Sequence, residues 1–158
     1  MEDLSAEAQE RVQYTLENAF ENPDLVEQLE SPLELHFFAV TWNWDNATTE
    51  PLLRVIRDKR CDKGTALHLY WMGDPISFYE NAGSREEVNN GVDVYDVVRE
   101  VEEKLVSNYY ENQNIKFDPR TAWTPGGITS NCLKQEMPSS LLEASLGVEV
   151  EDKYEFYN

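Results

Sequence analysis

The residue types best suited to chemistry gather between residues 31 and 74. Three aspartates in this stretch lie at the ends of aromatic-rich segments, and a cysteine precedes one of them. Carboxylates beside tryptophan rings would suit a sugar or a cation, because the rings offer apolar faces and the carboxylates accept hydrogen bonds. The residues that could line such a cleft are Trp42, Asn43, Trp44, Asp45, Cys61, Asp62, Trp71 and Asp74.

The three aspartates also have a structural interpretation, which we favour. Asp62 stands where the N-cap of a helix is expected, so its carboxylate would accept a hydrogen bond from a first-turn N–H. Asp45 and Asp74 lie beside residues that are typical of turns. Capping and turn formation account for all three residues without any function.

Cys61 is the candidate nucleophile of this stretch. It precedes a helix start and has Arg60 and Lys63 close by in the sequence, and both features lower the pKa of a thiol. A catalytic cysteine also needs a positioned base, which would have to be His36 or His68. Burial as a small packing residue is the favoured interpretation. Because no spacing such as HExxH or CxxC occurs, we expect no metal, no cofactor and no enzyme activity.

Three short helices are expected to position these residues. The order Ser-Pro-Leu-Glu at 31–34 is that of a capping box with proline at the first helical position, which predicts a helix start. Pro51 lies in the first turn of a second helix, and a third begins at Asp62 and ends at Gly73. The first helix is apolar on more than one face, which is typical of a buried helix.

The flanking segments predict further helices and one irregular region. Apolar residues recur every four positions over residues 4–20, and residues 93–109 carry the clearest helical stripe. From residue 115 onward turn residues predominate, and Trp123 in that region is expected to pack on the core. The sequence therefore predicts a mainly α fold, a compact bundle of about six short helices with an irregular C-terminal segment. No repeat of fixed period is present.

This length predicts one domain over residues 1–158. We expect a helical core over 31–120, an acidic N-terminal helix over 1–30 and an irregular C-terminal extension over 121–158. No signal-peptide pattern and no run of about 18 apolar residues occurs, so neither export nor membrane insertion is expected. Two cysteines make no disulfide framework, which favours a cytoplasmic location.

The charge of the chain is strongly negative, with a formal net charge of −18. Residues 1–30 alone carry nine acidic residues and one basic residue. Such a charge disfavours nucleic acid and anionic membranes as partners and favours a basic protein. The acids could also serve solubility alone. If they bind a partner, the candidates lie opposite the apolar stripe of the N-terminal helix and are Glu7, Glu10, Glu17 and Glu21.

Two groups of residues resemble a bacterial family catalogued as domain of unknown function 4274, over roughly residues 31–120. The first group consists of Asn43, Trp44, Asp45, Pro51, Cys61, Asp62, Gly64, Thr65, Ala66 and Leu67. The second group consists of Ile115, Phe117, Asp118 and Pro119. The chain departs from the family pattern at Asn46-Ala47, where Asp-Gly is expected, so this turn is expected to be built differently. The resemblance implies no established activity, although families of this kind resemble those found among toxin-immunity genes.

The leading hypothesis is an acidic inhibitor of the immunity type, which neutralises a basic bacterial toxin domain such as a nuclease. One alternative is a phage-type DNA mimic that occupies a nucleic-acid-binding protein, and it requires carboxylates spaced like phosphates. Another is a small-ligand binder or enzyme that uses the Trp/Asp/Cys cluster, and it requires a pocket there.

Overall fold

The computed structural model describes residues 3–122 and 137–158. These residues form helices joined by turns and loops, which confirms the mainly α fold predicted from the sequence. Within the described ranges, no helix combines the length and apolar character needed to cross a membrane. The α-helices are α1 (Ala6–Asn18), α2 (Pro32–Thr41), α3 (Glu50–Arg57), α4 (Lys63–Met72), α5 (Pro75–Asn81) and α6 (Val92–Val106), and the 3₁₀ helices are η1 (Pro23–Gln28), η2 (Arg85–Glu87) and η3 (Ser139–Leu142).

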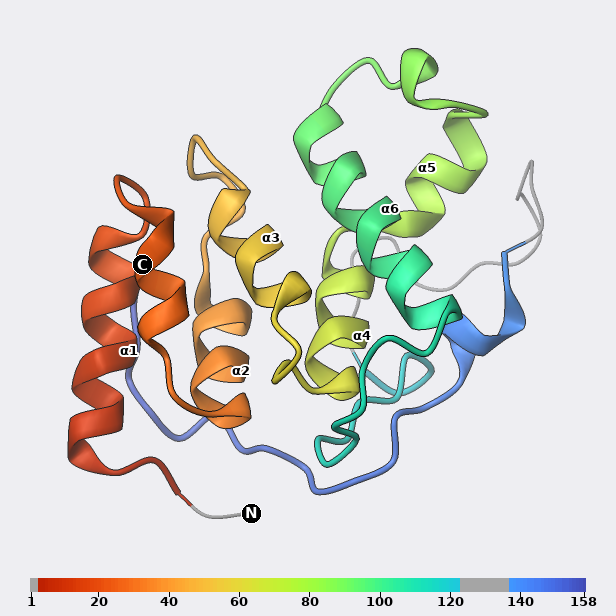
Figure 1. Ribbon diagram of the computed structural model, residues 1–158. Coiled ribbons are helices and arrows are strands. Elements are labelled where there is room, and N and C mark those ends of the chain that lie inside the picture. The colour runs from red at the N-terminus through yellow and green to blue at the C-terminus, as the bar shows by residue number, and fades with distance from the viewer. Residues whose placement is uncertain (1–2, 123–136) are drawn as a thin grey trace.

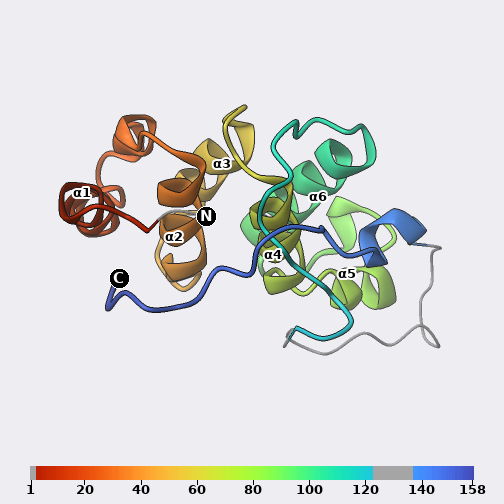
Figure 2. The same cartoon turned by 90° about the horizontal axis from the view of Figure 1, so that it is seen from below.

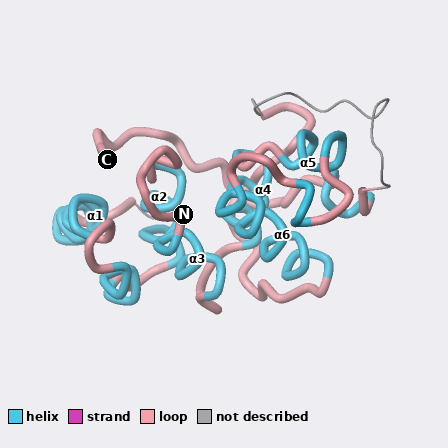
Figure 3. Tube along the Cα trace, turned by 90° about the horizontal axis from the view of Figure 1, so that it is seen from above, coloured by secondary structure: helices cyan, strands magenta, loops and turns pink. Residues whose placement is uncertain are grey.

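The helices stack in two layers that follow the order of the chain. Figure 1 shows α1, α2, α3, α4 and α6 succeeding one another across the molecule. The two perpendicular views place α1, α2 and α4 in one layer and α3 and α6 in the other (Figures 2 and 3). Helix α2 packs on α1, α3 and α4, while α6 packs on α3, α4 and α5. The arrangement is therefore a short array of helix pairs, although the sequence shows no repeat.

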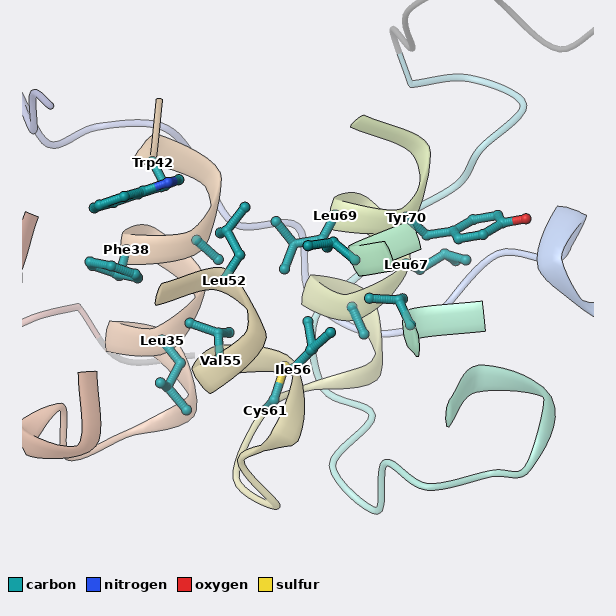
Figure 4. Packing of buried hydrophobic residues seen from close by; sticks show 14 of the residues in the cluster. Leu35, Phe38, Trp42, Leu52, Val55, Ile56, Cys61, Leu67, Leu69 and Tyr70 are labelled. Carbon is teal, nitrogen blue, oxygen red and sulfur yellow. The ribbon is translucent and has the colours of Figure 1, made fainter. Parts of the chain in front are cut away.

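The interior lies between the two layers. Val55 of α3 lies beside Leu35 of α2, and Leu52 of α3 lies beside Leu69 of α4, as Figure 4 shows. All four side chains are buried. Fully burying a side chain of this kind contributes roughly 1.5–3 kcal/mol, so this stretch supplies much of the core energy. Helices α2 and α4 are buried on most sides, as their apolar sequences predict.

Helix α5 follows α4 after a short turn, and the sequence patterns did not predict it. Asp74 has a φ of 54°, a left-handed conformation that reverses the chain after α4. Pro75 then occupies the first helical position, where its missing N–H is not needed. The ring of Phe78 meets that of Tyr95 edge-on, with centroids 5.1 Å apart, and this contact joins α5 to α6. The same turn therefore ends one helix and begins the next.

A buried carboxylate joins the last three α-helices. Glu102 of α6 accepts hydrogen bonds from the hydroxyl groups of Tyr70 in α4 and Tyr79 in α5, and it forms an ion pair with Arg99. Because a buried charge is costly unless it is paired, these three partners explain how a glutamate can occupy this position.

The C-terminal strap, defined here as residues 148–158, runs back across the array from α4 to α1 (Figures 1 and 2). It begins beside Ile115, which bridges to Val148, and it ends near α1. The hydroxyl group of Tyr154 accepts a 2.7 Å hydrogen bond from the Leu4 backbone N–H, and its ring meets Phe37 edge-on. Trp123, which was expected to pack on the core, lies outside the described residues.

Candidate functional site

The outer face of α1 carries the predicted acidic residues. Glu7, Glu10 and Glu17 are exposed, and their spacing of three and seven residues puts them on one side of the helix. Glu21 follows in the turn after α1 and is exposed as well. Val12 belongs to the opposite face and is fully buried. We call Glu7, Glu10, Glu17 and Glu21 the acidic stripe.

Exposed aromatic side chains accompany the acidic stripe, and sequence reasoning missed them. Tyr14 lies between Glu10 and Glu17 on the same face and is 56% exposed. Phe20 is 48% exposed, and Tyr157 of the strap is 65% exposed. The helical spacing of Tyr14 from its acidic neighbours was a signal that could have found it. Tyr157 could not be found, because the strap brings it to α1 from the far end of the chain.

The acidic stripe is poor in basic partners. Among the described residues, Glu10, Glu17 and Glu21 make no ion pair, and Glu7 reaches Arg11 only at 4.0 Å. Arg11 is itself held by Glu34 through two hydrogen bonds of 2.8 and 2.9 Å.. Further arginines are committed to other acids, as in the Arg57–Glu100, Arg60–Asp58 and Arg85–Asp96 ion pairs. The charge of the stripe is therefore left largely unneutralised within the described protein.

Three residues of the predicted cleft are buried in the core instead. Trp42, Cys61 and Trp71 are each at most 2% exposed. The indole N–H of Trp71 donates a 3.0 Å hydrogen bond to the carbonyl of Leu141, whereas the indole N–H of Trp42 has no partner in the described structure. These side chains supply packing, and none of them is placed to meet a ligand.

Cys61 is unsuited to nucleophilic attack. Burial raises the pKa of its thiol far above the usual range, and the carboxylates of Asp62 and Asp58 raise it further. The helix start and the basic neighbours, which favour a thiolate, are outweighed by these effects. The thiol therefore stays protonated, in agreement with the packing role favoured from the sequence.

Asp62 fixes the start of α4 and ties it to a distant segment. Its fully buried carboxylate accepts hydrogen bonds from the backbone N–H groups of Gly64 at 2.8 Å, Asn114 at 2.7 Å and Ile115 at 3.1 Å. A Cβ atom on Gly64 would lie 2.0 Å from the Ile115 carbonyl oxygen, so only glycine fits there. Thr65 completes the turn through a 2.9 Å contact between its Oγ1 and His36 Nδ1. Residues 61–65 thus have a structural role, since they start α4 and join it to residues 114 and 115.

The remaining predicted cleft residues lie at two separate places. Asn43, Trp44 and Asp45 form the turn after α2, where the Asp45 N–H donates to Asn43 Oδ1 at 2.9 Å. The Asn43 N–H donates to the side chain of Asn158 at the end of the strap. Asp74 follows the end of α4, about 15 Å of helix away from the Asp62 cap, and burial raises the pKa of its carboxyl group. The eight residues therefore do not share one cleft.

Both histidines line a pocket of about 340 Å³ beside Phe117. Burial lowers the pKa of His36 to about 3, helped by His68, and burial lowers the pKa of His68 to about 4. Both rings are therefore neutral at neutral pH, with centroids 6.2 Å apart. No group of three or more potential metal ligands occurs within residues 3–122 and 137–158.

Comparison with known proteins finds one family model, which matches slightly less than half of the chain. The model of the family described as Domain of unknown function (DUF4274) matches residues 30–106, which include α2 to α6. No curated protein and no solved structure matches the chain. The acidic stripe and the strap lie outside the matched segment. The DUF4274 model thus matches the helical segment that contains Asp62, as the motif around that residue predicts.

Proposed function

We propose that the protein binds a basic protein through the outer face of α1, as an inhibitor of the immunity type that neutralises a basic bacterial toxin domain. The observation that carries the proposal is the acidic stripe, which is exposed, lacks matched bases and has Tyr14 at its centre. Helix α1 stands at one end of the array (Figure 1), and Glu7, Glu10 and Tyr14 on its outer face are exposed.

Charge and aromatic anchors would contribute differently to such an interface. A row of carboxylates attracts a basic surface and raises the association rate, with a strong dependence on ionic strength. Tyrosine is enriched among the residues that dominate binding energy, because a rigid ring buries a large area and its hydroxyl group can still be paired. Tyr14 is therefore the expected anchor, and the glutamates around it are the expected source of selectivity for a basic partner.

The same observations count against the two alternatives, the DNA mimic and the ligand site or active site. A DNA mimic needs a regular row of charges, but Tyr14 interrupts the stripe between Glu10 and Glu17, and a phosphate backbone has no counterpart to an aromatic ring. A ligand site or active site built from the Trp/Asp/Cys cluster loses support, because Trp42, Cys61 and Trp71 are buried. Binding to a basic protein through α1 is the function that the geometry supports best.

The test is capture of partners from the native lysate by the tagged protein at low salt, followed by release with increasing salt. A basic protein should be released steeply by salt and should be lost when the stripe is reversed by Glu7→Lys, Glu10→Lys, Glu17→Lys and Glu21→Lys together. The control carries the same change of charge at exposed positions elsewhere, namely Glu103→Lys, Glu111→Lys, Glu143→Lys and Glu149→Lys, and should retain the partner.

The substitution Tyr14→Ala distinguishes the contribution of the tyrosine to partner binding from that of the acidic stripe. With the purified partner, Tyr14→Ala should weaken binding by at least about tenfold through faster dissociation, as expected for a hot-spot residue. The proposal fails if the stripe-reversed protein and its control lose the partner equally, or if no basic protein is captured at low salt.

A further inference from the structure

Three helices of one layer begin around a single pocket of about 670 Å³. The N-cap residues of α1, α2 and α4 all line it, namely Ser5, Ser31 and Asp62. Each cap side chain already accepts a hydrogen bond from the first turn of its own helix. The volume falls in the range of small-molecule sites in proteins. We call this cavity the N-cap pocket.

Apolar side chains from separate segments form the walls of the N-cap pocket. Leu4 precedes α1, Leu33 belongs to α2, Ile115 follows α6, and Val148 begins the strap. The Val148 N–H donates to the Asn114 carbonyl at 2.8 Å, which holds the strap against the wall. This contact and the Asp62 hydrogen bonds to Asn114 and Ile115 hold the walls of the pocket together.

The charges around the N-cap pocket nearly cancel. Three helix N-termini contribute roughly half a positive charge each, and the lining carries the three carboxylates of Asp3, Glu34 and Asp62. Arg11 and Lys153, which do not line the pocket, pair with Glu34 and Asp3. The positive and negative contributions therefore agree to within about one charge. No basic side chain lines the wall to hold an anion, and the lining carboxylates are already engaged.

We propose that the N-cap pocket binds a small, uncharged, mainly apolar organic molecule. The apolar walls favour such a body, and the balanced charges give no compensation for stripping water from an ammonium or carboxylate group. The side-chain amides of Gln113 and Asn114 make no hydrogen bond within the described residues and can pair with a hydroxyl or carbonyl group of the ligand. This inference does not rest on the proposed function of α1.

A matched series of probes tests the chemical class. The probes are 2-(1-naphthyl)ethanol, the corresponding amine and 1-naphthylacetate, which share one ring system and differ in charge. Isothermal titration and backbone amide shifts of the full chain should show binding of the alcohol on the order of millimolar, as expected for about 13 non-hydrogen atoms. The two charged probes should bind at least about fivefold more weakly. Failure of the alcohol to bind up to its solubility limit overturns the proposal, and so does tighter binding of a charged probe.

Two substitutions place the binding in the N-cap pocket. Val148→Trp should fill the cavity and abolish binding of the alcohol, whereas Val106→Trp should leave it unchanged. The two valines are 50% and 49% exposed, and Val106 lines no part of this pocket. Leu33→Trp fills the same space from α2 and serves as a second test if Val148→Trp perturbs the strap. Binding that survives both pocket substitutions in folded protein overturns the assignment.

Discussion

Acidic residues serve opposite purposes at the start of α4 and on the outer face of α1. Asp62 is fully buried, and its carboxylate accepts three hydrogen bonds from the backbone of the protein itself. The acidic stripe is exposed, and three of its four members lack an ion pair among the described residues. A carboxylate at a helix start stabilises the fold, whereas a row of carboxylates on an outer face is available to another molecule.

This difference shows how structural acidic residues can be distinguished from binding ones in a chain that contains 31 acidic residues. Residue type carries no information at this abundance, and the number of protein donors that reach each carboxylate separates the two groups. Glu17 marks the boundary between them, because it is exposed yet accepts hydrogen bonds from Gln13 and Tyr157. The comparison predicts that stability depends on the start of α4 and that partner binding depends on α1.

The largest expected effect is that of Asp62→Ala. It leaves three backbone N–H groups without their acceptor, and each of the two buried ones, on Gly64 and Ile115, costs about 1–3 kcal/mol. The free energy of unfolding should therefore fall by about 4 kcal/mol, measured by urea denaturation followed by circular dichroism. Asp62→Asn retains one acceptor oxygen and should lose about half as much. A loss below about 1 kcal/mol for the alanine variant would remove the contrast with α1.

A smaller effect for each residue is expected from the pH dependence of the two histidines, His36 and His68. Both histidines have a pKa below the usual 6.5 in the folded protein, so only the unfolded chain takes up these protons as the pH falls below about 6.5. The stability that depends on the two neutral histidines is therefore fully present above pH 6.5. Between roughly pH 6 and pH 4, the free energy of unfolding falls by about 1.4 kcal/mol per pH unit for each histidine.

The measurement is the free energy of unfolding as a function of pH for the wild type and for His68→Gln. The variant should lose stability less steeply with acidification, because one of the two groups no longer titrates. Parallel profiles would show that burial of His68 does not control the acid sensitivity of this region.

The smallest expected effect is that of neutralising the acidic stripe. The combined variant Glu7→Gln, Glu10→Gln, Glu17→Gln and Glu21→Gln should keep its free energy of unfolding within about 1 kcal/mol, because exposed charges contribute little. The same denaturation experiment checks this. A loss above about 2 kcal/mol would mean that the stripe supports the fold, and its proposed availability to a partner would then be in doubt.

The sequence predicted those parts of the fold that depend on local patterns. Ser31 and Asp62 were recognised as caps from their neighbours, and the apolar stripe of α1 placed its glutamates on the outer face. The hydrogen-bond partners of Asp62 could not be predicted from local patterns, because Asn114 and Ile115 lie more than fifty residues away in the sequence. Turn chemistry after Gly73 also failed to reveal α5, since the residues that end one helix are the same type that begin another.

The candidate site was predicted only in part for the same reason. Helical spacing places Glu10 and Glu17 on one face, yet exposure depends on which elements cover that face. The three tryptophans between residues 31 and 74 suggested a cleft, but Trp42 and Trp71 are buried in the core. The N-cap pocket depends on a strap wall that no local pattern reveals.

The strap also sets an order of events in folding. The helices contact neighbours that are close in the chain, and such contacts form early because little chain entropy is lost. The hydrogen bonds from Leu4 to Tyr154 and from Asn158 to Leu16 join residues 150 and 142 positions apart, and the strap is largely exposed. It should therefore dock last and open first, so its amide hydrogens exchange with solvent by local opening while those of α4 are protected until the whole array unfolds.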